Sequence, residues 1–93
     1  MSFTKESAIT TAKTDLAKRL GIGESQVSEV SAVDNDFPNA SLGAPVGDEM
    51  SAQMISSGWQ IILSAGGKNY EYRADKYQLR LVNFNGANVI VRS

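Results

Sequence analysis

The sequence predicts an α+β domain, in which one N-terminal amphipathic helix packs on an antiparallel meander sheet of four to five strands. Three observations support this: an apolar stripe at helical spacing near the N-terminus, and two tight turns, Gly66-Gly67 and Asn85-Gly86, each between strand-like runs. The order helix, strand, long loop, hairpin, hairpin indicates a single helix-on-sheet domain over residues 1–93, a length that suits one core.

The first element is a helix over residues 4–20. Its apolar stripe consists of Ile9, Ala12, Leu16 and Leu20. Thr4 or Ser7 can cap its N-terminus, and Gly21 follows the last apolar residue, where a left-handed residue ends many helices.

A short strand is predicted next, over residues 27–33, because Val30 and Ala32 alternate within it. From Asp34 to about Met54 turn-forming residues dominate and the periodicity stops. We expect a long loop there, and loops of that length in compact domains tend to be either functional or mobile.

The Gly66-Gly67 turn fixes the register of the first hairpin if it closes tightly. The predicted pairs are Ala65 with Lys68, Leu63 with Tyr70, Ile61 with Tyr72 and Trp59 with Ala74. Their larger side chains share one face, which is the expected partner of the helix. The opposite face, with Gln60 against Arg73, is expected to be solvated.

Asn85-Gly86 predicts the second hairpin between residues 79 and 91. The predicted pairs are Phe84 with Ala87, Val82 with Val89 and Leu81 with Ile90. Both faces of this hairpin are apolar, so periodicity leaves open which one is buried. A partly exposed face that meets a partner is one outcome.

Composition excludes several functional classes. The chain has no cysteine and no histidine, so it lacks thiol nucleophiles, disulfides, zinc-thiolate sites and the commonest general base. Ser41 would have no histidine to activate it, and the Gly66-Gly67-Lys68 turn fails the phosphate-loop pattern. We expect no cofactor and no metal, because the acidic loop also fails the calcium-binding pattern.

Charge is segregated along the chain. The segment from Glu24 to Glu49 carries only acidic charge, whereas the segment from Lys68 onward is mainly basic. The acidic segment is expected to face its own basic sheet or a basic partner. With a net charge of −1 and its aromatic residues assigned to the core, the chain is not expected to bind nucleic acid.

Charged residues interrupt the apolar positions between Met1 and Leu20, so no signal-peptide core and no membrane span is expected. The expected location is cytoplasmic, or exported if a signal has been removed.

Three segments carry a family resemblance: residues 37–47, 55–63 and 67–75. They resemble short uncharacterised bacterial and cyanobacterial domains with a Trp-Pro-Asp-x-Ser-Leu-Gly-Cys-Pro-x-Pro-Gly motif. Phe37, Ala44 and Arg73 replace that family's Trp, Cys and His. The resemblance implies a PepSY-like or cystatin-like layout, often in exported proteins or lipoproteins, and no established activity.

The loop supplies the candidate binding residues: Phe37, Pro38, Ser41, Leu42, Gly43, Pro45 and Gly47. Pro45 fixes its own φ and glycines permit positive φ, so the loop could form a rigid recognition surface. The alternative is an architectural loop in which Phe37 and Leu42 fill the core.

These observations favour a non-catalytic module that binds a protein or peptide through the loop at residues 37–47 and a sheet edge. One alternative is a structural domain that forms homo-oligomers through the hairpin at residues 79–91. The other is an enzyme of unusual type without histidine or cysteine. The sequence leaves the oligomeric state open.

Overall fold

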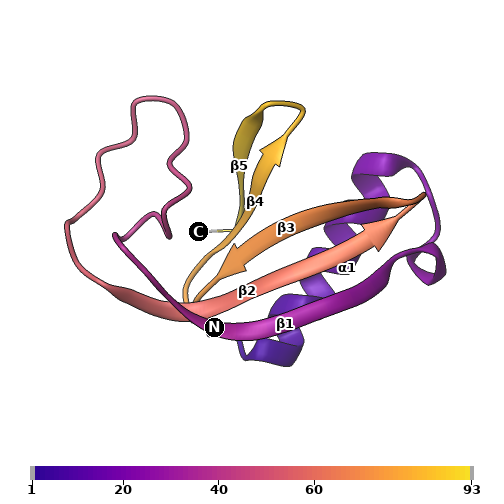
Figure 1. Cartoon of the computed structure of the whole chain (residues 1–93), viewed down its shortest axis with the longest axis horizontal. Helices are drawn as coiled ribbons and strands as arrows, with labels where there is room; N and C mark the ends of the chain where they lie inside the picture. Colours follow the sequence, from indigo (N-terminus) through magenta and orange to yellow (C-terminus); the bar gives the residue numbers. More distant parts are fainter. Residues whose placement is uncertain (1, 93) are drawn as a thin grey trace.

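The structure is a computed structural model that describes residues 2–92, and it confirms the predicted α+β architecture (Figure 1). One helix packs on a five-stranded antiparallel sheet with the strand order β1-β2-β3-β4-β5. The elements are α1 (Lys5–Leu20), a short 3₁₀ turn (Glu24–Gln26), β1 (Ser28–Phe37), β2 (Ser56–Ala65), β3 (Lys68–Ala74), β4 (Leu79–Phe84) and β5 (Ala87–Arg92). None of the helices among residues 2–92 is long and apolar enough to span a membrane.

Both ends of α1 are capped by residues that the sequence indicated. Thr4 is the N-cap and forms a capping box with Ser7, and Gly21 ends the helix with a left-handed φ of 67°. Of the predicted stripe, Ala12 and Leu16 are fully buried, and Ile9 and Leu20 are partly buried against the core, so the stripe faces the sheet.

The core lies between α1 and one face of the sheet. Its buried members are Ala8, Ala12, Leu16, Ala17, Val27, Ile61, Leu63, Ala65, Tyr72, Ala74, Leu79 and Leu81. The Tyr72 hydroxyl donates a 2.8 Å hydrogen bond to the Asp15 carboxylate, which also accepts one from Arg19. Burial, together with the Asp15 carboxylate, raises the pKa of Tyr72 well above its usual value.

The hairpin of β2 and β3 has the predicted register. Ala65 pairs with Lys68, Ile61 with Tyr72 and Trp59 with Ala74. The turn glycines Gly66 and Gly67 have φ values of 59° and 80°, which residues with a Cβ rarely adopt. Turn chemistry therefore set the register of this pair correctly.

The hairpin of β4 and β5 departs from the predicted register. Phe84 pairs with Ala87 as predicted, but Leu81 pairs with Val89 instead of Ile90 because the register shifts by one residue between Leu81 and Phe84. Asn83 lies within this irregularity with a φ of 53°. Such a bulge returns Phe84 to the face that packs on the core.

β1 is longer than predicted, which corrects the strand end at Val33 and the loop start at Asp34. Asp34, Asn35, Asp36 and Phe37 pair with β2 residues from Trp59 to Ser56. Asp and Asn have low strand propensity, but cross-strand pairing overrides a weak local preference. The loop therefore begins at Pro38 and runs to Ile55.

The sheet face opposite α1 is not fully solvated, which corrects a second expectation. The loop at residues 38–55 packs against Arg73 and Arg80 of β3 and β4, and the Arg80 residue is 4% exposed. In Figure 1 this loop lies beside the upright β4–β5 hairpin, whereas β1, β2 and β3 run across the view.

Candidate functional site

The seven candidate binding residues occupy two different environments. Phe37, Ser41 and Leu42 are at most 2% exposed. Gly43 is half-buried, and Pro38, Pro45 and Gly47 are exposed. The larger apolar members of the set thus fill the space between loop and sheet, and only the prolines and Gly47 remain at the surface.

Two arginines fix the loop to the sheet. Arg73 donates from Nη1 to the Leu42 carbonyl at 2.9 Å, and its guanidinium lies 5.5 Å from the centre of the Phe37 ring. Arg80 donates from Nη1 to the Ala44 carbonyl at 3.0 Å. These bonds satisfy loop carbonyls that regular secondary structure does not pair.

A carboxylate completes this attachment. Glu49 accepts hydrogen bonds on both oxygens from Arg80, with Nη2 to Oε2 at 2.7 Å. Hydrogen bonds from Arg80, and next from the Val46 backbone N–H, lower the pKa of Glu49 from 4.5 to about 2. Part of the acidic segment therefore faces the basic sheet, as the sequence suggested.

The turn at residues 39–43 is closed internally. The Asn39 side-chain oxygen accepts hydrogen bonds from the backbone N–H groups of Ser41 and Gly43 and from the Ser41 hydroxyl. Leu42 and Gly43 both have positive φ, of 58° and 66°. A Cβ on Gly43 would lie 2.9 Å from Nη1 of Arg73, so glycine permits the close approach of that arginine.

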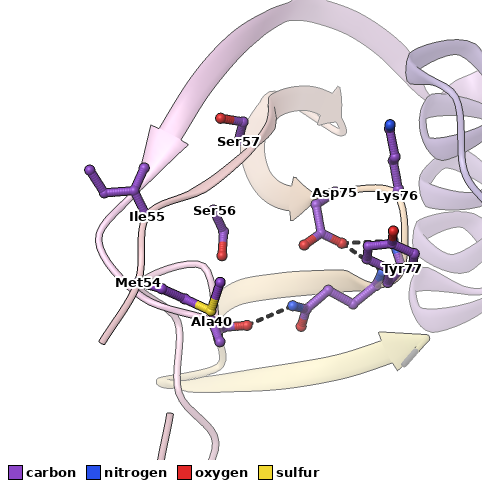
Figure 2. A pocket seen from close by; sticks show the side chains of 9 residues that line it. Ala40, Met54, Ile55, Ser56, Ser57, Asp75, Lys76 and Tyr77 are labelled. Carbon is purple, nitrogen blue, oxygen red and sulfur yellow. Dashed lines mark hydrogen bonds between the residues drawn. The ribbon is translucent and has the colours of Figure 1, made fainter. Parts of the chain in front are cut away.

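A groove lies elsewhere, at the end of the sheet where β1 ends and β2 begins (Figure 2). It has a volume of about 490 Å³. One wall is formed by residues 54–57 before and within β2, the other by residues 75–78 between β3 and β4, and Ala40 contributes from the loop. None of the seven candidate binding residues lines it.

Three large apolar side chains stand exposed around this groove. Met54 is 58% exposed, Ile55 71% and Tyr77 73%. Isolated exposed apolar residues are common on protein surfaces, but their convergence around one concave site is typical of interaction surfaces.

Hydrogen bonds stabilise the wall at residues 75–78. The Asp75 carboxylate accepts hydrogen bonds from the backbone N–H groups of Tyr77 and Gln78 at 2.8 and 2.9 Å. The Gln78 side chain donates to the Ala40 carbonyl at 2.7 Å, a bond that Figure 2 shows as the dashed line at Ala40. Tyr77 is therefore presented by a preformed turn that is tied to the loop.

A second hollow of about 360 Å³ adjoins the groove along β1. It is lined by Asp34, Asn35, Asp36, Ser57, Gly58, Trp59 and Lys76. Ser57 and Lys76 line both hollows, so they form one surface that continues from the end of β1 to Tyr77. The acidic side chains lie at one end of this surface and the apolar side chains at the other.

The groove combines apolar contact area with hydrogen-bonding groups, which is the chemistry of a binding surface. Its carboxylate, Asp75, is already bonded to the backbone of its own turn. Within residues 2–92, no group of three acidic side chains is arranged to hold a metal ion.

Sequence reasoning missed the groove residues for a definable reason. Met54, Ile55 and Tyr77 are apolar residues in segments otherwise made of turn and polar residues. That pattern indicates apolar side chains without a strand or helix to bury them. It does not indicate that two segments 21 positions apart in sequence lie on opposite walls of one groove.

Residues 9–82 match a protein family described as Domain of unknown function (DUF8738). The chain belongs to the DUF8738 family. The matched region runs from within α1 into β4 and therefore includes the loop and both walls of the groove. No functionally curated protein and no solved structure matches the chain. The specific motif and the PepSY-like or cystatin-like layout stay predictions.

Proposed function

We propose that this DUF8738 domain is a non-catalytic module that binds a protein or peptide, with the groove between Ile55 and Tyr77 as its binding surface. The observation that carries the proposal is the convergence of Met54, Ile55 and Tyr77, each more than half exposed, around one concave site. Burial of such side chains against a ligand's apolar residue is a common source of binding energy.

The loop at residues 38–55 has a supporting role in this proposal. Its polar and apolar contacts with Arg73 and Arg80 keep it on the sheet, and Ala40 receives a hydrogen bond from the groove wall. The loop thus orients the segment that leads into Met54 and Ile55. A preorganised wall lowers the entropic cost of binding.

The two alternative functions have less support. The homo-oligomer hypothesis needs a surplus apolar face on the β4–β5 hairpin. In the described part of this hairpin, however, Ile90 is the one large apolar residue that is exposed, at 39%. The enzyme hypothesis needs a free acid–base pair in the groove. The carboxylate that lines the groove, Asp75, already accepts two backbone hydrogen bonds from its own turn.

Selection of a random peptide display library against the intact domain tests the proposal. Selected peptides are expected to bind Ile55→Asp at least about tenfold more weakly than the wild type, because an anchor contact typically contributes more than 1 kcal/mol. Ile90→Asp is the matched control, since it introduces the same charge at an exposed isoleucine on β5. Peptides that bind Ile55→Asp and wild type equally would exclude the groove.

A further inference from the structure

We propose that the outer edge of β1 accepts an extended, basic peptide segment as an added strand, and that this segment continues into the groove at Ile55 and Tyr77. The inference rests on the proposed function and names the class of ligand for the same surface.

The first observation is the unpaired edge itself. β1 is the first strand in the sheet order and pairs with β2 on one side. On its other side no backbone group of residues 2–92 bonds to it. At ten residues it is also longer than β5, the six-residue strand at the opposite edge. A long edge strand presents a row of free N–H and C=O groups, which is what strand addition uses.

The second observation is the charge of the β1 side chains. Glu29, Asp34 and Asp36 are all exposed, and β1 contains no lysine or arginine. Asp34 meets Lys5 at 3.6 Å, yet its side chain is 85% exposed. Lys5 and Lys76 offset part of this charge, but the three carboxylates outnumber them. Each carboxylate keeps acceptor capacity for a basic ligand.

The third observation is that the last residues of β1 lie beside the groove. Asp34, Asn35 and Asp36 line the second hollow, which shares Ser57 and Lys76 with the groove. Side chains of an added strand alternate between the two faces of the sheet, so basic residues at every second position would lie beside Asp34 and Asp36. Ile55 and Tyr77 lie on the β2 side of β1, so the peptide has to turn across the end of the sheet beyond Phe37 for an apolar residue to reach them.

A second copy of this chain fits the edge less well than a basic peptide does. Antiparallel pairing of two β1 edges would bring carboxylates from both copies onto the same short ribbon. Like charges opposite each other destabilise a pair of strands, and charged edges are a known protection against self-association. The same charges favour a ligand of opposite sign.

The test uses the intact ¹⁵N-labelled domain and two synthetic peptides, in which lysine or glutamate alternates with valine or threonine before a terminal leucine. We expect the lysine peptide to slow hydrogen exchange of β1 amides and to give cross-strand contacts to β1. Neutralising the edge in Asp34→Asn/Asp36→Asn is expected to weaken its binding about threefold to tenfold, since cross-strand charge pairs make modest individual contributions. Asp48→Asn, which removes an exposed loop charge, is the matched control.

The outcomes separate this inference from the proposed function. Binding that is weakened by Ile55→Asp but leaves β1 exchange unchanged would overturn strand addition and preserve the groove. Protection of β1 that is insensitive to Ile55→Asp would support strand addition and overturn the groove. The inference would be overturned if both peptides bound equally or if neither bound. It would also be overturned if the β1 amides became protected without peptide as the protein concentration rose, because the edge would then pair with a second copy of the chain.

Discussion

Gly58 controls how closely β2 can approach the end of β3. It is buried, and a Cβ at this position would lie 2.0 Å from the Ala74 carbonyl oxygen, a backbone atom that a rotamer change cannot move. The residue also lines the second hollow. Any larger residue therefore has to displace the β2–β3 ladder beside the groove.

Gly58→Ala is accordingly expected to lower the free energy of unfolding by roughly 1–3 kcal/mol, the usual cost of overpacking a well-packed site. Urea denaturation monitored by circular dichroism measures it. Gly23→Ala is the control, because Gly23 has a φ of −76° and the nearest atom to its Cβ would be 3.7 Å away. Equal stability of the two variants would show that β2 and β3 are less tightly packed than described.

Glu49 gives the domain a pH-dependent contribution to stability. Its pKa is lowered in the folded state to about 2 from 4.5, so folding favours its ionised form. This contribution is fully present above the unfolded value and is lost as the pH falls through the folded value.

Glu49→Gln removes that titration, and the stability difference between wild type and variant should therefore depend on pH. We expect a constant difference above pH 4.5 that shrinks as the pH is lowered toward 2. Urea denaturation at several pH values provides the measurement. A difference that stays the same across this range would mean that Arg80 does not hold Glu49 in solution.

The loop at residues 38–55 is attached to the sheet by hydrogen bonds from two arginine side chains. Arg73 joins it to β3 through the Leu42 carbonyl, and its guanidinium also lies over the ring of Phe37, the last residue of β1. We expect the wild-type backbone at residues 40–46 to be nearly as rigid on the ps–ns timescale as the sheet.

Substitution of Arg73 by Gln should increase ps–ns motion of residues 40–46 while leaving α1 and the β2–β3 hairpin unchanged. ¹⁵N relaxation of the intact domain measures this directly. Lys76→Gln, at an exposed position, serves as the control for removal of one positive charge. A wild-type loop that is already as mobile as the variant would contradict the attachment described here.

Local chemistry explains which elements the sequence could predict. Some signals act over only a few residues: the helix end at Gly21, the Gly66-Gly67 turn and the stripe through Ala12 and Leu16. The helix therefore has the predicted bounds to within a residue or two, and the first hairpin has the predicted pairs. The register of the second hairpin depends on a bulge near Asn83, which the Asn85-Gly86 pattern does not encode.

The candidate site was less predictable because it depends on contacts between distant segments. The extension of β1 to Phe37 needs β2, and the hydrogen bond that the Leu42 carbonyl accepts comes from Arg73, which lies 31 positions further along the chain. Sequence reasoning identified the loop as important and identified Phe37 and Leu42 as possible core residues. It could not place Tyr77 opposite Ile55, since neither has a periodic context.

At the scale of the whole molecule, the two faces of the sheet are covered differently. α1 covers one face, and the loop at residues 38–55 covers part of the other beside β3 and β4. The end of the sheet, where β1 passes into the loop, keeps exposed apolar side chains and a groove. This asymmetry places the candidate ligand surface at one end of the domain.

A ¹H–¹⁵N correlation titration of the intact domain with a library-selected peptide is the decisive test of the groove as the binding surface. The largest amide shift changes are expected at residues 54–57 and 75–78, with little change in α1 or in β5. Changes concentrated at residues 38–47 or in the β4–β5 hairpin, with the amides of both groove walls unmoved, would contradict it.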